Sequence, residues 1–158
     1  MLRLLAVLIA AACSTAGVAA PTCGGDLRGA RKIESDHYVL VYRTQPAKIV
    51  VGKHFSVDLV SCPKGDAPLP EGVAVDATMP EHGHGMNYKA VVKPTGNDKV
   101  ALKPAVIPDK AALNPAARSS AHYRADGLMF HMPGRWDLTF ELRAAGKSER
   151  LTGSIVLE

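Results

Sequence analysis

The sequence predicts an all-β protein, built as an antiparallel two-sheet β-sandwich of about seven strands. Three observations favour this fold. Apolar and polar residues alternate along several short segments, turn-forming residues separate these segments, and almost no helical period is found from residue 37 onward. Short strands with one apolar face need a second sheet to cover that face, so the pattern indicates a sandwich.

The expected strands follow one another at regular intervals. Alternation marks residues 38–42, 55–59, 73–77, 88–92, 136–142 and 154–157, and turn residues gather at 52–53, 63–66, 94–98 and 145–148. The hairpin of residues 136–142 and 148–157 is the best defined, because alternation on both arms fixes its register. It places Trp136 in the core. His122 lies on a further expected strand, which enters a tight turn near Gly127.

A Pro-rich excursion interrupts this order at residues 94–120. Pro94, Pro104, Pro108 and Pro115 exclude a long helix and a central strand, since proline lacks the N–H that both need. The segment is therefore expected to be a long loop or flap.

The N-terminus has the pattern of a secretory signal peptide at residues 1–20. Arg3 precedes an apolar run too short to span a bilayer, and small residues lead to a cleavage site near Ala20. The expected mature chain has a flexible stretch at 21–35, one domain at 36–158 and no transmembrane helix. It is periplasmic or secreted. Alternatively, Cys13 follows a loose lipobox and carries a lipid tether.

The charge balance disfavours a nucleic acid as partner. Loss of the signal removes one of the 19 basic residues and none of the 15 acidic ones, so the net charge falls from +4 to +3. The basic residues are scattered along the chain and lack the interleaved aromatic residues of a stacking surface.

Cys23 and Cys62 remain as a pair once Cys13 has left with the signal. In an oxidising compartment such a pair predicts a disulfide, which would fix the mature N-terminus to the end of a strand. The alternative, two thiolate metal ligands, lacks the close spacing of such sites.

Two segments concentrate side chains that bind metals. Residues 79–86 contain Met79, His82, His84 and Met86, and residues 129–136 contain His131 and Met132. Imidazole and thioether together suit copper better than magnesium or calcium, and the sulfurs favour Cu(I). The candidate ligands are His82, His84, Met86, Met132 and His131, with His122 as an outside candidate.

A simpler interpretation stands beside this one. Methionines at strand ends often fill gaps in a core, and we expect Met79 and Met129 to do only that. Histidines flanked by glycines are often solvated. The chain is not expected to be an enzyme, because it lacks a nucleophile elbow, a phosphate-binding glycine loop and a zinc-protease helix.

The motif order resembles that of the YtkA-like domains, which are small secreted or membrane-tethered bacterial modules. The resemblance rests on Met79-Pro80, His82-Gly83-His84-Gly85, Tyr123 with Gly127, and Phe130-x-Met132-Pro133-Gly134-x-Trp136, and it covers residues 49–158. It implies an immunoglobulin-like sandwich similar in style to FixH-like and CopC-like envelope domains, several of which handle copper. His131 and Met86 lie outside the pattern, so their role as ligands rests on chemistry alone.

Two functional hypotheses follow. In the first, the domain is a non-catalytic periplasmic module that binds or transfers copper through its His/Met loop. In the second, it is a structural or interaction module that docks on an envelope protein without metal.

Overall fold

The computed structural model describes residues 23–25, 27–97 and 120–158, and within them it contains nine strands and no helix. The predicted signal, Cys13 and residues 98–119 of the Pro-rich excursion lie outside the described residues. The strands are β1 (Arg31–Glu34), β2 (Tyr38–Gln45), β3 (His54–Pro63), β4 (Gly72–Met79), β5 (His84–Gly85), β6 (Val91–Asn97), β7 (Ala121–Met129), β8 (Gly134–Ala144) and β9 (Lys147–Leu157).

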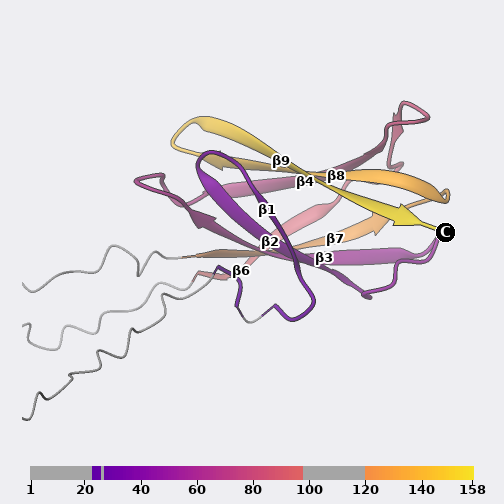
Figure 1. Cartoon of the computed structure of the whole chain (residues 1–158), viewed down its shortest axis with the longest axis horizontal. Helices are drawn as coiled ribbons and strands as arrows, with labels where there is room; N and C mark the ends of the chain where they lie inside the picture. Colours follow the sequence, from indigo (N-terminus) through magenta and orange to yellow (C-terminus); the bar gives the residue numbers. More distant parts are fainter. Residues whose placement is uncertain (1–22, 26, 98–119) are drawn as a thin grey trace, which may run out of the picture.

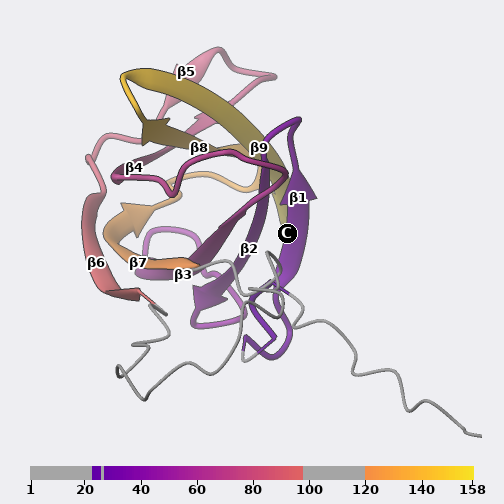
Figure 2. The same cartoon turned by 90° about the vertical axis from the view of Figure 1, so that its left-hand side faces the viewer.

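The strands form two antiparallel sheets that pack face to face (Figure 1). One sheet has the order β1-β2-β3-β7-β6 and the other the order β5-β4-β8-β9. Figure 2 shows the larger sheet from its end, with β6 and β1 at opposite flanks. The predicted β-sandwich is confirmed. The described strands outnumber the seven expected because β1 and β5 are short and carry no clear alternation.

The core lies between the sheets and follows the alternation seen in the sequence. Every second residue of β8 is buried from Trp136 onward, and Trp136 itself is fully enclosed. Tyr42 from the larger sheet meets Phe140 from the smaller one, with ring centroids 4.8 Å apart. The predicted β8–β9 hairpin is also confirmed, with Trp136 opposite Ile155.

Three local expectations need correction. β1 lies inside the stretch 21–35 that was expected to be flexible, because its backbone pairs with β2. The stripe at 88–92 becomes a strand only from Val91, and Tyr88 stays in the preceding loop. β7 continues through Gly127, whose φ of +84° allows the strand to pass without a turn.

Pro94 lies in β6, an edge strand that pairs only with β7. Proline is tolerated at a sheet edge, because one side of such a strand has no neighbouring strand that needs its N–H groups. The register shifts between Pro94 and Gly96, so the strand carries an irregularity at this point. β6 is an edge strand, so the exclusion of a central strand by proline agrees with the fold. The expected turn at 94–98 and the start of the expected loop need correction, because residues 94–97 pair with β7 as the end of β6.

The disulfide between Cys23 and Cys62 is present, as predicted, with Cα atoms 5.9 Å apart. It fixes the N-terminal segment to the end of β3. Gly24 then lies so close to Val41 that a Cβ at Gly24 would stand 2.8 Å from that of Val41. The outer face of β2 is covered there.

One end of the sandwich, called here the histidine end, gathers the segments of interest. β4, β7 and β9 finish there and β3 and β8 begin there (Figure 1). In the described part of the chain, no helix is long and apolar enough to cross a membrane.

Candidate functional site

The loop after β4 folds back on the strand that it leaves. The backbone N–H groups of His82 and Gly83 both donate to the carbonyl oxygen of Met79, at 3.2 and 2.9 Å. Gly83 has a φ of +66°, a conformation that glycine adopts without strain. The chain then reverses into β5, where His84 pairs with Met79. The loop therefore holds His84 beside the end of β4.

The second segment, which joins β7 to β8, is built around Trp136. Its indole Nε1–H donates to the carbonyl oxygen of Met132 at 3.0 Å, and Phe130 stacks on the indole with ring centroids 4.6 Å apart and planes 9° apart. Phe130 and Trp136 are both fully buried. His131 and Met132 are thus carried on a rigid base.

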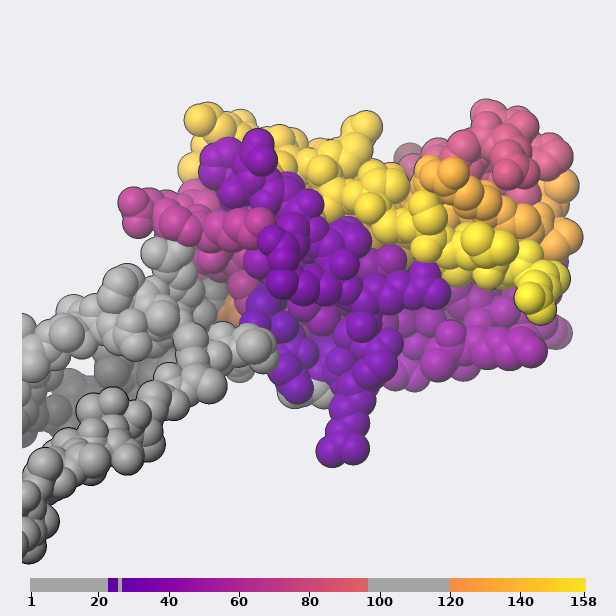
Figure 3. Space-filling model, in the orientation of Figure 1, coloured from indigo at the N-terminus to yellow at the C-terminus, as the bar shows by residue number. Residues whose placement is uncertain are grey.

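The two segments bring three imidazoles together at the histidine end. The rings of His84 and His131 are stacked, with centroids 5.1 Å apart and planes 30° apart, and His82 lies 5.7 Å from His84. The Trp136 ring makes edge contacts with His131 at 5.3 Å and with His84 at 6.3 Å. In Figure 3 the pink segment that includes β5 lies beside the orange segment that leads into β8.

Two nitrogens of this cluster are buried without a hydrogen-bond partner. They are Nε2 of His84 and Nδ1 of His131, and Ser61 Oγ is the other such side-chain atom in the described part of the chain. A buried polar atom that loses water and gains no partner costs about 1–3 kcal/mol. A bound ion or water that accepts these nitrogens as partners would remove that cost.

The three histidines differ in exposure. The side chain of His82 is exposed, whereas His84 and His131 are half-buried. None of the three hydrogen-bonds to or pairs with a carboxylate among the described residues. His82 therefore faces solvent at the mouth of the cluster, and the stacked pair forms its interior.

The methionines divide differently from the expectation, because Met129, expected to pack in the core, is half-buried and alternates with the buried Leu128 and Phe130. Met79 is fully buried in the core, which confirms its packing role. Met86 and Met132 are half-buried against the core, close in sequence to His84 and His131 respectively. Met86 is fixed by its N–H, which donates to the carbonyl oxygen of Ala77 at 3.1 Å.

The cluster is not a preformed site of charged ligands. Among the described residues, no three His, Cys, Asp or Glu side chains are arranged to hold a metal ion. A metal at this end would therefore depend on the two stacked imidazoles and on the neighbouring thioethers.

His122, the outside candidate, does not join the cluster. Its Nε2 lies 3.0 Å from Ser120 Oγ near the start of β7, at the opposite end of the sandwich. The two residues are separated because His122 lies near the start of β7 and His131 follows its end, so the length of the strand stands between them.

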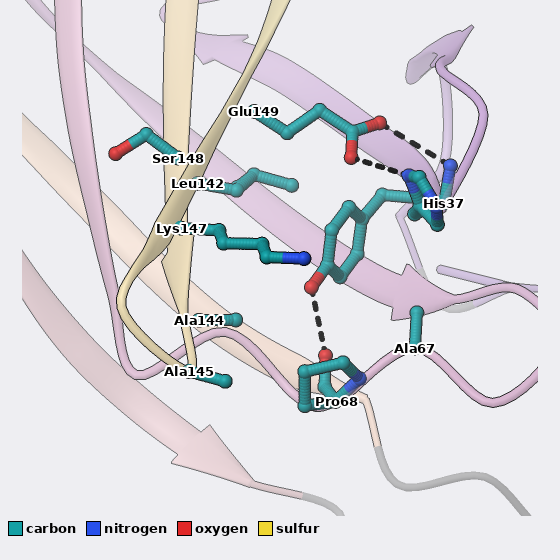
Figure 4. Close-up of a pocket in the computed structure, with 10 residues that line it drawn as sticks. His37, Ala67, Pro68, Leu142, Ala144, Ala145, Lys147, Ser148 and Glu149 are labelled. Atoms are coloured by element: carbon teal, nitrogen blue, oxygen red, sulfur yellow. Dashed lines mark hydrogen bonds and ion pairs between the residues drawn. The ribbon is translucent and has the colours of Figure 1, made fainter.

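A second concave feature, which the sequence did not reveal, lies at that opposite end (Figure 4). It is a cavity of about 370 Å³ with an apolar wall that includes Tyr38, Leu142 and Ala144. At its rim, His37 Nδ1 lies 2.8 Å from a carboxylate oxygen of Glu149. Burial alone raises the pKa of Glu149, but hydrogen bonds from Ser35 and His37 hold it below the usual value. The lining residues come from β2, β8, β9 and the loops beside them, so they are far apart in the sequence and no local motif indicates the cavity.

No protein-family model and no curated protein matches the chain. The resemblance to YtkA-like domains therefore stays a prediction that rests on the motif residues.

Proposed function

We propose that this protein is a non-catalytic envelope module that binds copper at the histidine end, with His84 and His131 as the holding ligands. The observation that carries the proposal is the pair of buried, unpartnered nitrogens on stacked rings. Folding places both nitrogens out of water without supplying a protein partner. A metal ion is a partner that two imidazoles from separate loops can share.

The neighbouring side chains favour copper. Met86 and Met132 lie next to the imidazole pair in sequence and pack at the same end, and thioether with imidazole is a ligand set typical of copper. His82, exposed and 5.7 Å from His84, supplies a further imidazole at the mouth. All five candidate residues thus belong to one end of the sandwich. Two are the holding imidazoles, two are the neighbouring thioethers, and His82 is the outer imidazole.

The surroundings restrict how the two holding residues move. His131 follows Phe130, which stacks on Trp136, and His84 is fixed to β4 by strand pairing. Ligands on such supported positions keep their geometry before the ion arrives, which reduces the entropy lost on binding. The predicted export of the chain and its YtkA-like motif order support the same proposal.

Trp136 provides the direct test, because it is the single tryptophan of the chain and its ring contacts both holding residues. Titration of the purified protein with Cu(I) under anaerobic conditions should quench its fluorescence at one equivalent. The variant His84→Ala/His131→Ala should lose this response, and the control His54→Ala, whose ring packs on Tyr88, should keep it. Equal and weak uptake by wild type and the double variant would contradict the proposal.

A second candidate function is docking on an envelope protein without metal. Val50, Tyr88 and Val156 are large, exposed apolar side chains, and all three lie at or near the histidine end. Exposed apolar side chains at one end of a sandwich are candidates for an interaction site. In this case the Cu(I) titration gives no saturable response, and Tyr88→Ser weakens association with a partner while His84→Ala does not.

A further inference from the structure

We infer that the cluster selects a monovalent soft cation, Cu(I) or its redox-inert analogue Ag(I), and rejects divalent Cu(II) and Zn(II). The inference rests on the proposed function and adds the charge of the ion that the site takes. Three features carry it: the neutrality of the ligands, their burial, and their small number.

All the ligands that the cluster offers are neutral. Imidazole and thioether contribute lone pairs and no negative charge. Glu81 is exposed, and Asp137 accepts hydrogen bonds from Arg135 at 3.1 Å and from Ser154 at 2.6 Å. An ion bound by these ligands therefore keeps its full charge.

Burial makes the charge of the bound ion decide which ions the cluster accepts. The two unpartnered nitrogens are inaccessible to solvent, and both rings contact Trp136, which is fully buried and stacks on Phe130. The cost of moving an ion from water to such surroundings rises with the square of its charge, and only counter-charges or many polar ligands offset it. A divalent ion meets neither here, whereas a monovalent ion with strong soft-ligand bonds is penalised much less.

The number of ligands leads to the same selection. Structural zinc sites are tetrahedral, and Cu(II) prefers a square arrangement of nitrogen and oxygen ligands. The described residues contain no three His, Cys, Asp or Glu side chains arranged for such a site. Cu(I) and Ag(I) are stable with only two or three ligands, so they accept two imidazoles in a near-linear arrangement, or two imidazoles and a thioether.

Competition between ions tests the inference on the intact purified protein. Trp136 fluorescence and calorimetry are followed with silver nitrate, anaerobic Cu(I), Cu(II) sulfate and zinc sulfate. We expect Ag(I) and Cu(I) to bind at least about 100-fold more tightly than Zn(II) or Cu(II). Met86→Leu/Met132→Leu should weaken Ag(I) binding, and Met129→Leu, a half-buried methionine outside the candidate ligands, should not.

A variant that adds a negative charge to the cluster tests the same inference in the opposite direction. Met132→Glu places a carboxylate beside His131, so the preference should shift towards Zn(II) by at least about tenfold. Urea unfolding of each variant shows whether the fold persists.

Tight binding of Zn(II) or Cu(II) by the wild type, equal to that of Ag(I), would overturn the inference while the proposed metal site stands. Failure of every ion to bind would overturn both.

Discussion

The Cε atom of Met79 lies 2.5 Å from the point where a Cβ on Gly134 would stand. Gly134 also has a φ of +116°, which L-residues with side chains rarely adopt. This contact packs the end of β4 against the start of β8, directly beneath the histidine cluster. The backbone conformation therefore favours glycine at position 134, and a Cβ there would also force the end of the buried Met79 side chain to move.

Gly134→Ala should destabilise the protein by about 2–4 kcal/mol, because overpacking adds to backbone strain. Urea unfolding measures the loss. Gly146→Ala is the matched control, since Gly146 has a φ of +74° but open space around it, and its loss should be about 1 kcal/mol. Equal losses in the two variants would contradict the role of the Met79 contact.

A second close approach joins the sheets at Gly153. A Cβ there would overlap the hydroxyl of Tyr42, which reaches across the core from β2 to β9. Gly153→Ala should cost about 1–3 kcal/mol. In the double variant with Tyr42→Phe, the loss should be smaller than the sum of the single losses, because the overlapping oxygen is gone. Simple additivity in a double-mutant cycle would show that the overlap is relieved elsewhere.

Loss of the disulfide should destabilise the fold, because the unfolded chain then regains the entropy that the closed loop had removed. Cys23 and Cys62 are 39 residues apart, and the chain-entropy relation gives about 4 kcal/mol for a loop of this length. Cys23→Ser/Cys62→Ser should therefore lower the urea midpoint of unfolding, as should reduction of the wild type. If reduction leaves the midpoint of the wild type unchanged, the bond does not contribute in solution.

Acid should remove part of the stability through Glu34. Hydrogen bonds from Lys32 and Lys64 lower the pKa of Glu34 from its usual 4.5 to about 2. Because the folded value is the lower one, the contribution is complete above pH 4.5 and disappears as the pH falls towards 2. Glu34→Gln should flatten the dependence of the unfolding midpoint on pH in this range, and salt should reduce the difference.

Glu71→Gln is the control for this measurement. Glu71 is exposed and has no ion pair with any other described residue. A pH profile of Glu34→Gln that matches those of the wild type and Glu71→Gln would contradict the role of the Lys32 and Lys64 contacts.

The sequence predicted the strands whose two faces differ. Residues 136–142 alternate because one face meets the core and the other meets water, and β8 follows this pattern residue by residue. Arg31–Glu34 and His84–Gly85 gave no such signal, because β1 is mostly exposed and β5 is only two residues long. β1 pairs with β2 and β5 pairs with β4, in each case with the neighbouring strand in the chain across a short loop.

The sequence predicted the candidate ligands by type but not their arrangement. His84 and His131 are 47 positions apart, and their stacking follows from the sheet order β5-β4-β8 and from Trp136, on which both rings pack. No local pattern contains that order. The burial of His84 Nε2 and His131 Nδ1, which carries the functional proposal, is likewise visible only once the two loops are placed together.

The central claim is that these two nitrogens bind the ion, and long-range proton–nitrogen NMR of the imidazole rings tests it most directly. On addition of Ag(I), the resonances of His84 Nε2 and His131 Nδ1 should shift and show coupling to silver, while those of His37 and His54 stay in place. Unchanged resonances for His84 and His131 at saturating Ag(I), or coupling at His37 or His54, would contradict the account.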